Sequence, residues 1–162
     1  MEKSSRERLL DAGLELLGTV GSARASARAA EDRAAVPHGS VRYHFGSFDG
    51  FLDALVAHLV DVDRPRPGES PAEVCARWLG PQRTVTRARY ELTLLAFGRP
   101  ELADRLVAGR DVFVATLIDA GCAPDVARRL VAALDGLVLD ALLRGETTLD
   151  PTPLIAMLTV DR

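Results

Sequence analysis

Apolar residues recur along this chain every three to four positions, the spacing that places them on one face of an α-helix. The first such stretch covers residues 4–19. Ser4 or Ser5 can cap this helix, and Glu7 follows Ser4 at the spacing of a capping box. Gly18 and Gly21 indicate its end. The apolar face consists of Leu9, Leu10, Leu14, Leu16, Leu17 and Val20.

Three further helices are predicted before the middle of the chain. Ser26 is a plausible N-cap for the first, and Ser47 can cap the third after the break at Gly46. Pro37 suits the first turn of the second, because its missing N–H would be unpaired there in any case. A tight turn at 34–36 separates the first two. The predicted ranges are 26–33, 37–44 (or 45) and 48–62.

Residues 63–71 form the clearest linker, because the run DRPRPGESP contains three prolines and a glycine. Beyond it the apolar periodicity resumes. We expect helices at 71–80, 82–98, 100–120 and 124–144, with Gly109 as a possible interruption, and a short last helix after Asp150. The pattern predicts an all-α protein, divided at 1–47, 48–62 and 70–162.

The composition agrees with an all-α fold, since 48% of the residues are hydrophobic but only 5% are aromatic. The net charge of −3 excludes a polybasic chain, and residues 1–50 carry seven basic and seven acidic side chains. Any binding to nucleic acid would therefore depend on the local placement of arginines rather than on bulk charge.

The sequence contains no arrangement of residues typical of catalysis or metal binding, so we expect no enzyme, no catalytic or metal site and no cofactor. Cys75 and Cys122 stand too far apart for a zinc motif or a disulfide scaffold. Reduced, inert thiols in a cytoplasmic protein are the simpler interpretation, with a redox sensor as the alternative. No apolar run approaches the roughly 20 residues of a membrane span.

Residues 21–52 combine two short helices and a tight turn with a supporting helix on each side, which is the layout of a helix-turn-helix. The second short helix, Pro37 to His44, has a length that suits the DNA major groove. Gly39 would let the backbone approach DNA closely. We also expect free N–H groups at the N-terminal end of this helix to attract phosphate.

The ordered run GSVRYHFGS after Val36-Pro37 resembles the DNA-binding domain of the TetR family of transcriptional regulators. The resemblance covers most of residues 5–60 and rests on Gly21, Ser26, Arg28, Ala34, Val36, Gly39, Ser40, Val41, His44, Phe45, Ser47 and Leu52. The chain departs from the family pattern where Ala30-Glu31 replaces Ile-Ala, Ala35 replaces Gly, Arg42 replaces Tyr and Phe48 replaces Lys. We expect Ala35 to carry mild strain and Phe48 to cost one phosphate contact.

The resemblance implies a set of DNA-binding residues: Arg28, Pro37, His38, Gly39, Ser40, Arg42, Tyr43 and His44. Two of them have a structural alternative, since Arg28 could form an ion pair within the domain and Tyr43 could pack on the following helix. Val41 and Phe45 are expected in the core.

The C-terminal part is similar to that of many TetR-like regulators. The apolar stripe of 124–144 is too broad for one packing surface, so we expect this helix and the C-terminal helix to pair with a second copy. The resemblance also implies a small-molecule cavity, for which Trp78, Tyr90 and Phe97 are candidates, although each could be plain core. Arg77, Arg87 and Arg89 could bind an acidic effector, but a solvated helix face is the simpler interpretation. His58 could relay motion or titrate, but a surface position is the simpler interpretation.

The resulting hypothesis is a dimeric repressor that leaves a pseudo-palindromic operator when it binds a small molecule. The alternative is a helical small-molecule or protein-binding module of the same fold that has lost operator binding. The neutral N-terminal third and Phe48 favour that alternative.

Overall fold

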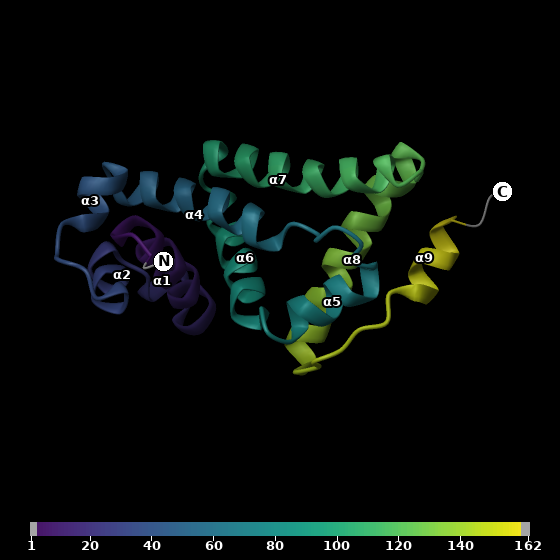
Figure 1. Ribbon diagram of the computed structural model, residues 1–162, viewed down its shortest axis with the longest axis horizontal. Helices are drawn as coiled ribbons and strands as arrows, with labels where there is room; N and C mark the ends of the chain where they lie inside the picture. Colours follow the sequence, from purple (N-terminus) through teal and green to yellow (C-terminus); the bar gives the residue numbers. More distant parts are fainter. Residues whose placement is uncertain (1–2, 160–162) are drawn as a thin grey trace. The chain divides into compact units, whose positions relative to one another are not determined.

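A computed structural model describes residues 3–159, and within this range the chain is all-α, as predicted. The helices are labelled in Figure 1. They are α1 (Ser5–Val20), the short 3₁₀ helix η1 (Ser22–Arg24), α2 (Ala27–Ala34), α3 (Ser40–Phe45), α4 (Phe48–Asp63), α5 (Pro71–Leu79), α6 (Arg83–Ala96), α7 (Pro100–Asp119), α8 (Pro124–Arg144) and α9 (Thr152–Thr159). None of these helices has the length and apolar character that a membrane span requires.

The helices form two compact units whose membership does not follow the order of the chain. The first unit joins the residues up to Asp63 with Thr84–Leu106, so α6 packs with the N-terminal helices. The second unit comprises Arg64–Arg83 and the chain from Val107 onward. These are units of packing, and the functional division at residues 47 and 70 remains a prediction.

The helix ends are specified by local sequence signals. The N–H of Glu7 donates to Ser4 Oγ at 3.2 Å while the N–H of Ser4 donates to the Glu7 carboxylate at 2.8 Å, which completes the predicted capping box of α1. Ser70 and Glu73 repeat this arrangement at α5. Helix α8 begins at Pro124 and ends before Gly145, whose φ of +76° suits glycine.

The core of the first unit lies between α1, α4 and α6. Its largest fully buried side chains include Leu9, Leu14, Leu17, Phe51, Leu52, Leu55 and Leu92. Gly18 lies inside α1, so the prediction that it marks the end of the helix is wrong, whereas Gly21 is the C-cap. A Cβ on Gly18 would stand 1.9 Å from the carbonyl oxygen of Thr84 on α6. The glycine therefore permits two helices to approach closely, a role that the sequence pattern did not indicate.

Helix α6 is also held in the first unit by two polar contacts. Arg89 forms an ion pair with Asp63 at the end of α4, with 2.6 Å between Nη2 and Oδ2. Glu91 accepts hydrogen bonds from the backbone N–H and the hydroxyl of Ser22 in η1, at 2.8 and 2.7 Å. Both pairs join residues far apart in the sequence.

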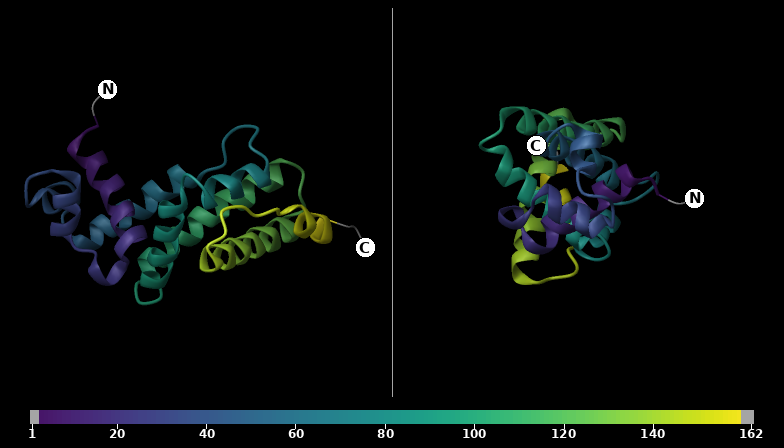
Figure 2. Two further views of the ribbon diagram at one scale, coloured as in Figure 1. Left: turned by 90° about the horizontal axis from the view of Figure 1, so that it is seen from below. Right: turned by 90° about the vertical axis from the view of Figure 1, so that its left-hand side faces the viewer.

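In the second unit, α5 and α9 each pack against α8, and Figure 2 shows α9 following α8 at the end of the chain. Trp78 is buried and its ring lies 5.8 Å from that of Phe113. Arg77 is buried beside Glu69, with 2.7 Å between Nε and Oε1, and also bonds the side chain of Gln82. This ion pair anchors the predicted linker to α5.

Candidate nucleic-acid interface

The second short helix of the predicted helix-turn-helix begins later than the sequence indicated. Helix α2 starts after Ser26, whose hydroxyl accepts the N–H of Ala29 at 3.2 Å. Helix α3, however, begins at Ser40, so the prediction of Pro37 in its first turn is wrong. The reason is Gly39, whose φ of +91° is incompatible with an α-helix. Pro37 and His38 therefore belong to the turn.

Ala35 adopts a left-handed conformation at the end of α2, with φ +51°. Among the described residues it is the one non-glycine residue with a positive φ. The strain expected at this position is therefore confirmed, because a Cβ disfavours this region of backbone space.

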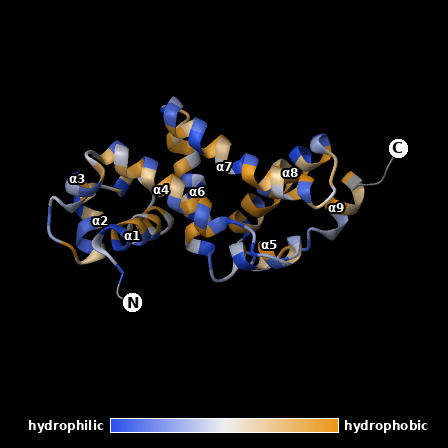
Figure 3. Ribbon diagram, turned by 45° about the horizontal axis from the view of Figure 1, so that its top comes forward, coloured by the Kyte–Doolittle hydropathy of each residue, from blue (hydrophilic) through white to orange (hydrophobic). Residues whose placement is uncertain are grey.

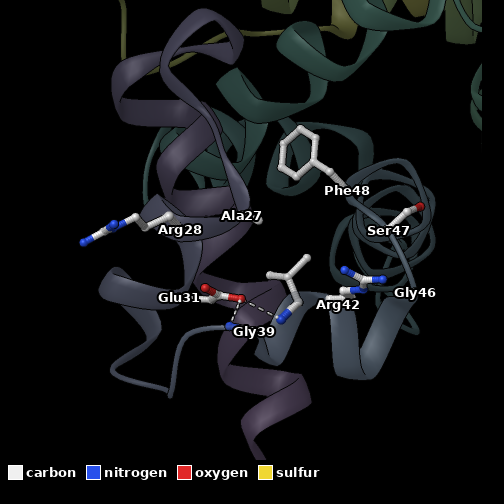
Figure 4. A pocket seen from close by; sticks show the side chains of 9 residues that line it. Ala27, Arg28, Glu31, Gly39, Arg42, Gly46, Ser47 and Phe48 are labelled. Carbon is white, nitrogen blue, oxygen red and sulfur yellow. Dashed lines mark hydrogen bonds between the residues drawn. The ribbon is translucent and has the colours of Figure 1, made fainter.

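Glu31 fixes the start of α3 through hydrogen bonds. Its side chain is only 4% exposed, and Oε1 accepts the N–H groups of Gly39 and Val41 at 3.0 and 2.9 Å. Figure 4 shows this carboxylate pointing toward both N–H groups. The N–H of Ser40 donates to the carbonyl of Pro37. The N–H groups of Gly39, Ser40 and Val41 are therefore not free to bind phosphate, contrary to what we expected of these three groups. Glu31 is a functional candidate that the sequence analysis missed.

The outward face of α3 carries the candidates for contact with DNA. Tyr43 is 85% exposed, so its alternative role in packing on α4 is wrong. Arg42 and Arg28 are exposed as well, and neither forms an ion pair with any residue in 3–159. His44 is partly buried, with its ring 4.9 Å from that of Tyr43. These side chains are available to an external partner.

Two apolar side chains hold α3 on the rest of the unit. Val41 is fully buried, as predicted, and Phe45 is partly buried with its ring 5.0 Å from that of Phe51. In the preceding turn, Pro37 and His38 are exposed, and His38 Nε2 lies 2.7 Å from the Asp32 carboxylate. The turn is thus tied to the end of α2.

An open hollow of about 460 Å³ lies between α2, α3 and the start of α4. Arg28 and Arg42 lie on opposite sides of it in Figure 4, with Glu31 between them. Phe48, which replaces the family's lysine, is partly buried and packs against Phe51, with 6.1 Å between their ring centroids. The positive charge at the rim therefore comes from the two arginines.

The candidates for effector binding fall in different units. Trp78 belongs to the second unit, whereas Tyr90 is partly buried and Phe97 is 85% exposed in the first. Phe97 is therefore not plain core, and the cavity role of all three stays a prediction. Arg77 and Arg89 are not on a solvated face, because both are engaged in the ion pairs described above.

Other singled-out residues have structural surroundings that explain them. His58 Nε2 lies 2.9 Å from Asp11 Oδ1, so this histidine links α4 to α1. Cys75 is fully buried, whereas Cys122 is partly exposed.

Comparison with known proteins gives a consistent result over nearly the whole chain. Residues 68–160 match the family described as Tetracyclin repressor-like, C-terminal domain. No curated protein matches the sequence.

Solved structures match both in fold and in sequence. The multidrug binding protein EbrR, in complex with ethidium, is 30% identical with a TM-score of 0.75, over 96% of this chain and 98% of that one. A TetR family member from Streptomyces coelicolor A3, SCO1917, is 32% identical with a TM-score of 0.77, over 97% of each chain. The regulator RHA1_ro04179 from Rhodococcus sp. Rha1 is 27% identical with a TM-score of 0.67, over 86% and 84% of the two chains.

Proposed function

We propose that this chain, which belongs to the TetR family of transcriptional regulators, binds operator DNA as a homodimer and releases it when a small molecule binds. In this proposal α3 is the recognition helix, and residues 1–47 form the DNA-binding domain. The release would make the protein a repressor.

One observation carries the DNA-binding part of the proposal. Arg42 and Tyr43 extend outward from α3, and Arg28 flanks the same hollow from α2. An exposed arginine on a short helix can bond the O6 and N7 atoms of guanine or a backbone phosphate, and tyrosine hydroxyls contact phosphates. The remaining candidates, Pro37, His38, Gly39, Ser40 and His44, surround the start of α3 or continue it.

The experiment is selection from random double-stranded DNA, followed by fluorescence anisotropy at two salt concentrations. We expect tight, salt-sensitive binding that exceeds binding to competitor DNA. Arg42→Ala should weaken it by roughly tenfold or more, because one good base contact contributes about 1–3 kcal/mol. Arg87→Ala removes an exposed arginine from α6, outside both α3 and the helices proposed for dimerisation, and is the matched control.

Homodimerisation is proposed through α8 and α9. Leu139 and Leu143, four residues apart on one face of α8, and Met157 of α9 are exposed, and Figure 3 shows apolar stretches along both helices. Exposed apolar residues grouped on neighbouring helices are typical of subunit interfaces. Sedimentation velocity should give a dimer for the unmodified protein and a monomer for Leu143→Arg. If the unmodified protein and Leu143→Arg were both monomers, the proposal of homodimerisation would be contradicted.

An aromatic organic molecule is the proposed effector class, because EbrR was solved with ethidium and also with proflavin. Ethidium is the first probe. Planar cationic dyes bind DNA directly, so calorimetric titration of the protein without DNA comes first. Trp78 is the only tryptophan of the chain, and its fluorescence would report binding near α5. Binding that leaves operator affinity unchanged would contradict the release mechanism.

A second candidate function is a binding module of the same fold that does not bind DNA. The equal numbers of acidic and basic residues in 1–50, together with the packed Phe48, favour it. It predicts no salt-dependent selection of any DNA sequence.

A further inference from the structure

Glu31 connects α2 to α3 through both its main chain and its side chain. Its carbonyl oxygen accepts the N–H of Val36 at 3.1 Å, just beyond the end of α2. Its carboxylate accepts the N–H groups of Gly39 and Val41 at the start of α3. One residue therefore holds the turn of the helix-turn-helix at both ends.

Helix α3 needs such support because it has six residues and no side-chain cap of its own. Helices this short are not stable alone in water. Hydrogen bonds from N–H groups to an ionised carboxylate are roughly twice as strong as neutral ones. The buried Val41 side chain holds α3 on the core, whereas the Glu31 bonds determine the direction in which α3 leaves the turn.

The position of Glu31 also relates it to both arginines of the rim. Arg28 precedes it by three residues on α2, about one helical turn, and Arg42 directly follows Val41 on α3. A change in the angle between α2 and α3 would alter the separation of the two guanidinium groups. Sequence reading requires that separation to match the spacing of phosphates and base edges.

We propose that Glu31 is a positioning residue for DNA reading, which fixes α3 relative to α2 and keeps phosphate from the N–H groups of Gly39 and Val41. This inference rests on the proposed function. Because the carboxylate already accepts the N–H groups of Gly39 and Val41, DNA would be contacted by side chains of α3 rather than by these amides.

The test compares Glu31→Ala and Glu31→Gln with the unmodified protein. The readout is the ratio of affinities for the selected sequence and for random DNA, corrected for the folded fraction. Glutamine retains an oxygen that accepts both N–H groups, so its ratio should stay within about threefold of the original. Alanine should lower the ratio by about tenfold, because α3 then samples several orientations. Glu15→Ala removes an exposed carboxylate that pairs with Arg33 and controls for the loss of charge.

If Glu31 had a purely structural role, Glu31→Ala would lower the folded fraction, but the folded molecules would keep the same ratio of affinities for selected and random DNA. That result would overturn the inference. Amide hydrogen exchange provides a readout without DNA. The N–H groups of Gly39 and Val41 should exchange at least about tenfold faster in Glu31→Ala, whereas that of Ala29 should not. Unchanged exchange at Gly39 and Val41 would also overturn it. Failure of the unmodified protein to select any DNA would refute the proposed function instead.

Discussion

The ion pair between Glu69 and Arg77 should make the stability of the second unit depend on pH. The two side chains are only 9% and 6% exposed and meet through two bonds, at 2.7 Å to Oε1 and 2.8 Å to Oε2. The hydrogen bonds from Arg77 lower the pKa of Glu69 from its ordinary value of 4.5 to about 2. A difference of that size corresponds to roughly 3 kcal/mol of folding free energy.

The sign follows from the lowered pKa of the folded state. The ionised form of Glu69 is favoured by folding, so its contribution is fully present above pH 4.5 and is lost as the pH falls toward 2. Glu69→Gln removes the titrating group. We therefore expect the unmodified protein to be more stable than the variant at pH 7, with a gap that narrows by about 3 kcal/mol between pH 5 and pH 2.

The assay is urea unfolding of both proteins at a series of pH values, followed by Trp78 fluorescence, since Trp78 lies next to Arg77 on α5. Asp111→Asn replaces an exposed carboxylate on α7 and serves as the control. The difference in free energy of unfolding between the two proteins has a part that changes with pH, and this part reports the titration of Glu69. The free-energy cost of leaving Arg77 without its partner hardly varies between pH 7 and pH 2. A gap that stays constant from pH 7 to pH 2 would refute the reasoning.

Three further predictions concern the helix ends and one helix contact, and urea unfolding measures all of them. Ala35→Gly should stabilise the protein by up to about 1 kcal/mol, because relief of the left-handed strain exceeds the added entropy of the unfolded chain; a loss of stability would contradict the strain. Gly18→Ala should destabilise it by at least about 2 kcal/mol, because its Cβ would displace the Thr84 carbonyl; the higher helix propensity of alanine alone predicts the opposite sign. Ser4→Ala should cost about 1 kcal/mol through the lost capping box, and an unchanged midpoint would show that this box contributes nothing.

The sequence predicted the helices best where their ends carry local signals. Pro124 and Gly145 delimit α8, and the predicted range 124–144 agrees with the structure. Ser4 and Glu7 likewise indicated the start of α1, where they form the predicted capping box. These signals act between residues within one or two turns, so they are readable along the chain.

The predictions failed where a contact outside a residue's own helix, or a special backbone conformation, decides the outcome. Pro37 favours the first turn of a helix, but the left-handed Gly39 and the bonds to Glu31 delay α3 to Ser40. Arg77 and Arg89 have the spacing of a solvated face, yet each is paired with a carboxylate in another segment. Periodicity places a side chain on a face of its own helix but does not identify the partner that covers it.

The two polar contacts of α6 have a mechanical consequence. Arg89 and Glu91 are two residues apart, which places them about 200° apart around the helix axis. One is bonded to the end of α4 and the other to the segment that connects α1 with α2. Rotation of α6 about its own axis would therefore pull these two attachment points in opposite directions. These two contacts therefore resist rotation of α6 within the first unit. If α6 did rotate, it would displace the end of α4 and the η1 segment together, and these two segments flank α2 and α3 in the sequence.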